Sequence, residues 1–259
     1  MKTKTFTAAI LIFFFALISS SSPLKKKAIS LKKAMEENPY PQISAIPVPK
    51  GFKRIASDKN SFAYWLRDVH LKKNNTVFLF DGRRKTNQKA QFAVLDFSVG
   101  TKDLQQCADA IMRLKAEYLF DREKFNEIVF FDNDGEKYPF QKPFSRDNFK
   151  LYLQKIFGVC GSASLSKQMH TVNILKNINP GDVFIRGGFP GHAVIVMDVA
   201  IDSTGVKAFL LAQSYMPAQD IHLLINPSNE VISPWYLVND DLKIETPEFT
   251  FRSNELKRW

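Results

Sequence analysis

Three residues in this sequence have side chains suited to nucleophilic attack on a carbonyl group: Cys107, His192 and Gln213. A thiol at a helix N-terminus is activated as a thiolate by the helix dipole and an adjacent imidazolium, and a third polar side chain can orient the imidazole ring. Cys107 lies near the start of a predicted helix, His192 begins a predicted strand, and Gln213 lies on the following strand. This order predicts a cysteine hydrolase in which Cys107 attacks, His192 serves as base and then acid, and Gln213 orients the ring.

The segments around these residues predict how they come together. Turn signals at residues 202–205 separate the strands of His192 and Gln213, so we expect these two strands to pair. The glycine loop RGGFPGH before the first strand allows backbone conformations with positive φ and leaves room for a substrate chain. Backbone amides at the helix start could hold an oxyanion. The residues expected to contact a substrate are Gln106, Gly188, Gly191, Ser214 and Tyr215.

Each member of this candidate triad also has a purely structural interpretation. Cys107 lies on the apolar face of its helix, and free cysteine is among the most buried residue types. It also follows the predicted helix cap, Asp103, by four residues, where the effect of the dipole is fading. His192 could be a buried, hydrogen-bonded histidine, Gln213 a buried amide, and the glycine loop a simple hairpin connection.

A second cysteine leaves the role of the first one open. In an exported protein, Cys107 and Cys160 could form a disulfide, which would remove the nucleophile. Cys160 lies in a glycine-flanked turn before a predicted helix, where a nucleophile could also be placed, so it is the second candidate. The four histidines lack metal-ligand spacings, and the chain has no phosphate loop or dinucleotide motif. We therefore expect no metal and no cofactor.

The elements that must position these residues predict an α+β protein. Helices are expected over residues 61–68, 104–120 and 149–158. The apolar runs at 76–82 and 90–99 predict a β-hairpin with a long loop. The expected architecture is an antiparallel β-sheet packed against a few helices. Further strands are expected in 127–140, which contains an Asp-Gly turn, and at 181–188, 191–202, 207–216 and 221–226.

The N-terminal 22 residues have the composition of a secretory signal peptide: two lysines, an apolar run over residues 8–18, and then small residues. That run is shorter than the about 20 helical residues that cross a bilayer. Residues 23–45 are polar and contain proline, so we expect a flexible spacer before a single domain at 46–259. We expect a monomer exported to the periplasm or cell envelope, with membrane contact only through an uncleaved leader.

The charge of the chain is basic, with 36 Lys and Arg against 26 Asp and Glu and a net charge of +10. The basic residues are scattered and no nucleic-acid motif accompanies them, so a solvated basic face is expected and nucleic acid is not. The excess of basic over acidic residues suits an envelope polymer or peptide as the partner.

Several long strings resemble the bacterial family named domain of unknown function 4846: QQCADAIMRLKAEYLF, GDVFIRGGFPGHAVIVMDVA, LLAQSYMPAQDIHLL, SPWY and TPEF. They span most of residues 46–259, and the family name assigns no reaction. The resemblance implies a small or different residue in place of Cys160, and tryptophan in place of Phe249, a change expected to affect packing only. The family's motif residues would be Cys107, Asp109, Arg113, Glu117, Asp182, Gly188, Gly191, His192, Gln213 and Ser214.

The order of Cys107, His192 and Gln213 is also similar to that in NlpC-type cell-wall cysteine peptidases, a papain-like group. The chain differs by a long insertion before the histidine and by lacking an Asp-Cys-Ser-Gly type sequence. This resemblance implies a papain-like core and an amidase or peptidase acting on cell-wall amide bonds, such as those of peptidoglycan stem peptides. The alternative is a non-catalytic protein that binds an envelope polymer or peptide in a groove lined by Phe189, Tyr215, Trp235 and Tyr236.

Overall fold

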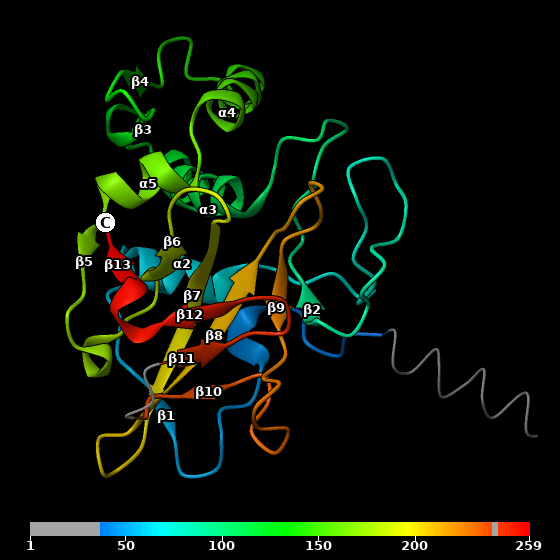
Figure 1. Ribbon diagram of the computed structural model, residues 1–259, viewed down its shortest axis with the longest axis vertical. Coiled ribbons are helices and arrows are strands. Elements are labelled where there is room, and N and C mark those ends of the chain that lie inside the picture. Colours follow the sequence, from blue (N-terminus) through cyan, green and yellow to red (C-terminus); the bar gives the residue numbers. More distant parts are fainter. Residues whose placement is uncertain (1–36, 240–242) are drawn as a thin grey trace, which may run out of the picture. The chain divides into compact units, whose positions relative to one another are not determined.

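Two apolar runs in the last third of the sequence form the central strands, β7 (His192–Ile201) and β8 (Lys207–Gln213), of an antiparallel sheet. The computed structural model describes residues 37–239 and 243–259 (Figure 1). The strands follow the order β2-β9-β8-β7-β6-β13-β5, and β1 and β10 pair with β7 and β8. Their bounds are β1 Lys53–Arg54, β2 Gln91–Val94, β5 His170–Thr171, β6 Val183–Arg186, β9 His222–Leu224, β10 Tyr236–Leu237 and β13 Leu256–Arg258.

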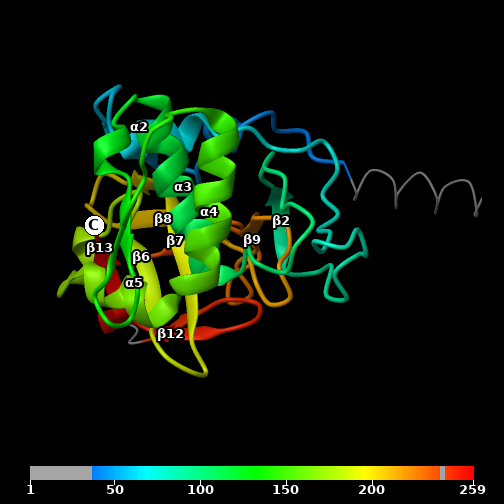
Figure 2. The same cartoon turned by 90° about the horizontal axis from the view of Figure 1, so that it is seen from above.

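The sheet lies between a layer of helices and a C-terminal hairpin (Figure 2). Because side chains alternate along a strand, Ala193 and Ile195 of β7 face the helices, whereas Val194 and Val196 face the opposite layer. The helices are α2 (Phe62–Asp68), α3 (Cys107–Asp121), α4 (Arg146–Val159) and α5 (Ser162–Gln168). The opposite layer contains the hairpin of β11 (Lys243–Glu245) and β12 (Thr250–Arg252).

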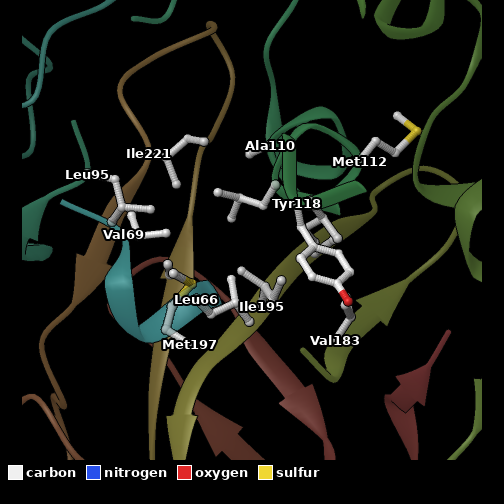
Figure 3. Packing of buried hydrophobic residues seen from close by; sticks show 14 of the residues in the cluster. Leu66, Val69, Leu95, Ala110, Met112, Tyr118, Val183, Ile195, Met197 and Ile221 are labelled. Atoms are coloured by element: carbon white, nitrogen blue, oxygen red, sulfur yellow. The ribbon is translucent and has the colours of Figure 1, made fainter. Parts of the chain in front are cut away.

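The helical side of the core is built where α2 and α3 meet β7 (Figure 3). Leu66 of α2 and Ile111 of α3 are fully buried in the same apolar cluster as Ile195 and Met197 of β7. This packing holds α3 against the strand that carries His192. The relative position of Cys107 and His192 is therefore set by core packing and not by a mobile loop.

The predicted helices are present, but the longest of them starts later than expected. α3 begins at Cys107, with Gln106 as its N-cap, and the Gln106 N–H donates to Asp109 Oδ2 at 2.9 Å. Asp103 does not cap the helix; its Oδ1 accepts from the Ala218 N–H at 2.7 Å. Cys107 is thus the first helical residue, where the dipole acts most strongly, which corrects the expectation that its effect is fading.

One predicted hairpin is present and one is wrong. Residues 127–140 form β3 (Val129–Phe131) and β4 (Lys137–Pro139), as expected from the Asp-Gly turn. The runs at 76–82 and 90–99 do not pair with each other. Instead β2 adds to the sheet beside β9, and the Phe80 N–H donates to the Ala218 carbonyl. Pairing with an existing sheet edge buries the apolar side chains of β2, which a two-stranded hairpin could not do.

The folded part begins earlier than predicted. Ile43 is fully buried in the core, and the Asn38 side chain donates to the Tyr40 and Lys72 carbonyls. Residues 37–45 therefore belong to the domain and not to a spacer. The predicted leader, residues 1–22, and residues 23–36 lie outside the described residues. Within 37–239 and 243–259, no helix has the length and apolar character to cross a membrane.

Candidate functional site

His192 and Gln213 come together at one end of the two central strands, and Cys107 lies beside the strand that carries the histidine. His192 begins β7 and Gln213 ends β8, and antiparallel pairing places these strand ends side by side. The His192 Nε2 and Gln213 Oε1 atoms are 2.8 Å apart, and both residues are buried. The Cys107 thiol lies against the backbone N–H of Ala193, the residue after His192. The hydrogen bond to Gln213 occupies the Nε2 atom of the ring.

The His192 ring is enclosed by aromatic side chains. The ring of Tyr215 lies 4.7 Å from it between centroids, that of Phe249 lies 5.1 Å away, and Phe251 stacks on it at 5.8 Å. Burial lowers the pKa of His192 to about 4, against the smaller raising effect of the Gln213 hydrogen bond. The imidazole is therefore neutral at pH 7. Phe249, where the family resemblance implied tryptophan, contacts the candidate base directly.

The Cys107 thiol is protonated at neutral pH. Burial raises its pKa to about 11, and the Asp109 carboxylate adds to the shift, whereas the N–H groups of Ala108 and Ala193 oppose it. Desolvation thus outweighs the favourable position at the helix start. The expected thiolate–imidazolium pair is not the resting state of this site, because the Cys107 thiol and the His192 imidazole are both neutral.

Gln213 belongs to a network that the sequence did not indicate. Its Nε2 donates to Glu248 Oε2 at 2.8 Å and lies 3.4 Å from His222 Nε2. Glu248 also accepts from Lys85 Nζ at 2.5 Å and from Asn87 Nδ2 at 3.0 Å. These residues come from segments far apart in the chain. The sequence signal that could have indicated this network is the TPEF string, which contains Glu248 and resembles a family motif.

The TPEF string forms the turn that delivers Glu248 and Phe249 to the site. The Thr246 hydroxyl accepts from the Phe249 N–H at 3.1 Å and donates to the Phe249 carbonyl at 2.7 Å. The turn precedes β12, so Glu248 is directed at Gln213 while Phe249 packs on His192. One short turn therefore contacts two members of the candidate triad.

The residues predicted to contact substrate have different surroundings. Gly188, at φ +95°, is exposed in the loop before β7, and Tyr215 is half-buried against His192. Gln106 is partly exposed, but its Nε2 donates to Asp103 Oδ1 at 3.1 Å. Ser214 is fully buried, and its hydroxyl contacts the Gln105 and Gln219 carbonyls. Ser214 therefore fixes the segment before Cys107 and cannot reach a substrate.

Gly191 is required by its packing. A Cβ atom there would lie 2.2 Å from the Gly188 carbonyl oxygen and 2.8 Å from that of Arg186. We expect Gly191→Ala to lower the free energy of unfolding by about 2 to 4 kcal/mol, measured by denaturant titration. Gly158→Ala in α4 is the control: with open space at that position, it should stabilise by up to about 1 kcal/mol. Equal stability of Gly191→Ala and the wild type would contradict this packing.

Both cysteines are free thiols, so the Cys107–Cys160 disulfide that the sequence left open is not formed. Cys160 is 8% exposed in the apolar core, and burial raises its pKa to about 11. These properties make it a core residue and remove the case for a second nucleophile. The described residues contain no group of histidine, cysteine and acidic side chains arranged to hold a metal ion.

Asp109 is a buried carboxyl beside the helix start. Burial raises its pKa to about 8, and its Oδ1 has no hydrogen-bond partner. A folded-state pKa above the ordinary value means that its contribution to stability is present below about pH 4 and is lost as the pH rises toward 8. We expect Asp109→Asn, which keeps an acceptor for the Gln106 N–H, to gain stability over the wild type as the pH rises from 4 to 8. Thermal unfolding across this range tests the sign, and a pH-independent difference would refute it.

Other family motif residues hold the scaffold. Arg113 donates to the Ser98 carbonyl and to Gln105 Oε1, which fixes the segment leading to Cys107. Glu117 pairs with Arg146 at 2.5 Å. Asp182 is buried and accepts two hydrogen bonds from the Arg258 guanidinium, at 2.6 and 2.7 Å, which anchors the C-terminal strand. Their ion pairs are structural and lie apart from the triad.

Comparison with known proteins identifies a family. The family described as Domain of unknown function (4846) matches the chain over residues 43–145 and 140–258. No curated protein and no solved structure matches it. Because the two matched segments together cover more than half of the chain, this protein belongs to the family of domain of unknown function (4846).

Proposed function

We propose that this protein is an exported cysteine hydrolase that cleaves amide bonds of the cell envelope, with Cys107 as nucleophile and His192 as general base. The observation that supports the proposal most directly is the 2.8 Å contact between His192 Nε2 and Gln213 Oε1, with Cys107 at the first residue of α3 beside the histidine strand. The proposal is supported by the order of the residues and their elements, since a helix carries the thiol and two paired strands carry the histidine and its partner, an arrangement similar to that of papain-like triads.

The neutral resting state defines the proposed chemistry. The Cys107 sulfur attacks the carbonyl carbon while its proton passes to His192 Nδ1, so that no free thiolate accumulates. The resulting imidazolium then gives this proton to the leaving amine, and a thioester remains. Water, deprotonated by His192, hydrolyses the thioester and regenerates the thiol. Backbone N–H groups in the first turn of α3 would stabilise the oxyanion.

The surroundings of the site offer apolar contacts to a peptide backbone and small side chains. Phe189 is 94% exposed in the loop between β6 and β7, and Met216 is 51% exposed in the segment after β8. Both segments leave the sheet at the end where His192 and Gln213 lie. Exposed apolar side chains on both sides of a catalytic pair are suited to hold an extended peptide. Peptidoglycan stem peptides are the proposed class.

Alkylation of Cys107 by iodoacetamide tests the proposed resting state. Since burial raises the pKa of the thiol to about 11, the rate should keep rising from pH 7 to pH 10, with no acidic plateau. Mass spectrometry identifies the modified cysteine, and denatured protein gives the reference rate. A plateau starting near pH 5 would show a standing thiolate and contradict the concerted proton transfer.

A second candidate function, non-catalytic binding of an envelope polymer or peptide, is favoured by one observation. Burial raises the pKa of Cys107, whereas catalytic cysteines have a lowered pKa. Incubation with purified muropeptides separates the two functions. A hydrolase forms a thioester on Cys107 that intact-mass measurement detects and releases free amine, whereas a binding protein shows saturable binding in calorimetry and leaves the peptides intact.

A further inference from the structure

We infer that Glu248 is a positioning residue for the base: it fixes the orientation of the Gln213 side-chain amide, and through that amide it determines which nitrogen of His192 carries the proton. This inference concerns a structural property, the tautomer of His192. Its consequence for catalysis rests on the proposed function. The argument follows from which groups in the network can donate and which can only accept.

Glu248 fixes one end of the Gln213 amide. When ionised, a carboxylate only accepts hydrogen bonds, and Glu248 is surrounded by donors: Lys85 Nζ at 2.5 Å, Asn87 Nδ2 at 3.0 Å and Gln213 Nε2 at 2.8 Å. The Lys85 ammonium forms an ion pair with this carboxylate. The group of Gln213 that faces Glu248 must therefore be its NH₂.

His222 supports the same orientation from a second direction. Its Nδ1 lies 2.9 Å from the Asp220 carbonyl oxygen, which only accepts, so Nδ1 carries the proton. The ring is fully buried, and burial lowers its pKa to about 3, so it is neutral. Its Nε2 is then an acceptor that faces Gln213 Nε2 at 3.4 Å. Both acceptors near this amide thus select the same orientation.

The consequence reaches His192 through the carbonyl oxygen of Gln213. With its NH₂ turned to Glu248 and His222, the amide presents Oε1 to His192 Nε2 at 2.8 Å. An oxygen acceptor requires a proton on that nitrogen, so the neutral ring is the Nε2–H tautomer. The free lone pair is then on Nδ1. In the proposed mechanism, Nδ1 is the nitrogen that must accept the thiol proton.

Loss of the Glu248 carboxylate should weaken this polarity, because His222 Nε2 would then be the one acceptor of the pair that still favours the wild-type amide orientation. Lys85 is 7% exposed and has only donor hydrogens. Without Glu248, its ammonium group would donate to the Gln213 carbonyl oxygen. Where the amide turns its NH₂ toward His192, Nε2 of that ring would have to accept and the proton would move to Nδ1, so the population of the Nδ1–H tautomer should rise. In that tautomer the ring cannot take the thiol proton through Nδ1.

Nitrogen-15 NMR of the histidine rings of the full chain tests the inference without a substrate. In the wild type, His192 Nε2 should resonate as a protonated nitrogen and Nδ1 as an unprotonated one; the reverse assignment would overturn the inference. Glu248→Met should shift His192 toward the Nδ1–H tautomer, and an unchanged tautomer in a folded Glu248→Met protein would equally overturn it. Glu248→Gln, which retains an acceptor oxygen, should restore the wild-type tautomer at least in part.

Glu255→Gln is the matched control. Glu255 forms a two-pronged ion pair with Arg186, the residue whose guanidinium lies over Phe249, and it makes no contact with Gln213. It tests whether loss of a half-buried carboxylate in the same C-terminal segment is enough to change the tautomer, and we expect it to change nothing at His192. A shift there as large as that in Glu248→Met would overturn the inference.

Hydrolysis of muropeptides separates this inference from the proposed function. If both hold, Glu248→Met should reduce kcat by about 100-fold or more, since positioned general-base catalysis contributes roughly 10²- to 10⁴-fold, while KM changes little. If the tautomer shifts as expected but the wild type cleaves no amide, the inference stands and the proposed function fails. If the wild type cleaves and Glu248→Met retains full kcat with an unchanged tautomer, the inference fails and the function stands.

Discussion

Replacing Cys107 with alanine is expected to abolish amide hydrolysis and to leave the fold intact. The substitution removes only the sulfur of a partly exposed side chain at the first residue of α3, so the cap formed by Gln106 and Asp109 remains. Loss of the nucleophile from a catalytic triad lowers kcat on the order of 10⁶-fold. The measurement is the release of new amino groups from purified muropeptides, with circular dichroism to verify the fold.

Cys160→Ala is the control for this experiment. The thiol of Cys160 is buried in the core, so its removal should lower stability by about 1 to 2 kcal/mol and leave hydrolysis unchanged. Activity retained in Cys107→Ala would contradict the mechanism. Activity lost in both variants would point to folding and not to chemistry.

The parts of the site that could be predicted from the sequence are those defined by local patterns. The apolar strand after the glycine loop and the apolar strand after the turn at 202–205 were both recognisable, and their pairing brings His192 to Gln213. The periodicity of α3 was equally clear. Its start was not, because Asp103 is a strong capping type, whereas in the structure its oxygen is bonded to the Ala218 N–H, a contact remote in sequence.

The parts that could not be predicted depend on long-range contacts. Glu248 and Lys85 are 163 positions apart and meet only because the TPEF turn folds back onto the end of β8. Their residue types alone are those of a surface ion pair. The protonation state of the triad was also inaccessible, because the pKa values of Cys107 and His192 are shifted mainly by burial, which spacing does not reveal. Sequence patterns thus indicated that His192 and Gln213 meet, but not which groups surround them and determine their protonation.

The strand that carries His192 also contains the buried charge whose removal should destabilise the protein most. Asp198 of β7 is fully buried, and its two oxygens pair with Arg54 and Arg67 at 2.6 Å each. Its Oδ1 also accepts from the Val199 N–H at 2.9 Å. One carboxylate thus links β1, α2 and β7. Replacement by alanine leaves two guanidinium groups without their counter-charge, so we expect Asp198→Ala to lower the free energy of unfolding by about 3 to 5 kcal/mol.

Denaturant titration measures this loss, and two controls assign it. Asp81→Asn removes the partner of Arg83 at an exposed ion pair and should leave stability essentially unchanged. In the Arg54→Met and Arg67→Met background the charges are removed together, so Asp198→Ala should then cost less than in the wild type. An equal cost in both backgrounds would show that Asp198 acts through its backbone contact. A cost under about 1 kcal/mol in the wild type would refute the buried ion pair as the element that holds β1 and α2 on the histidine strand.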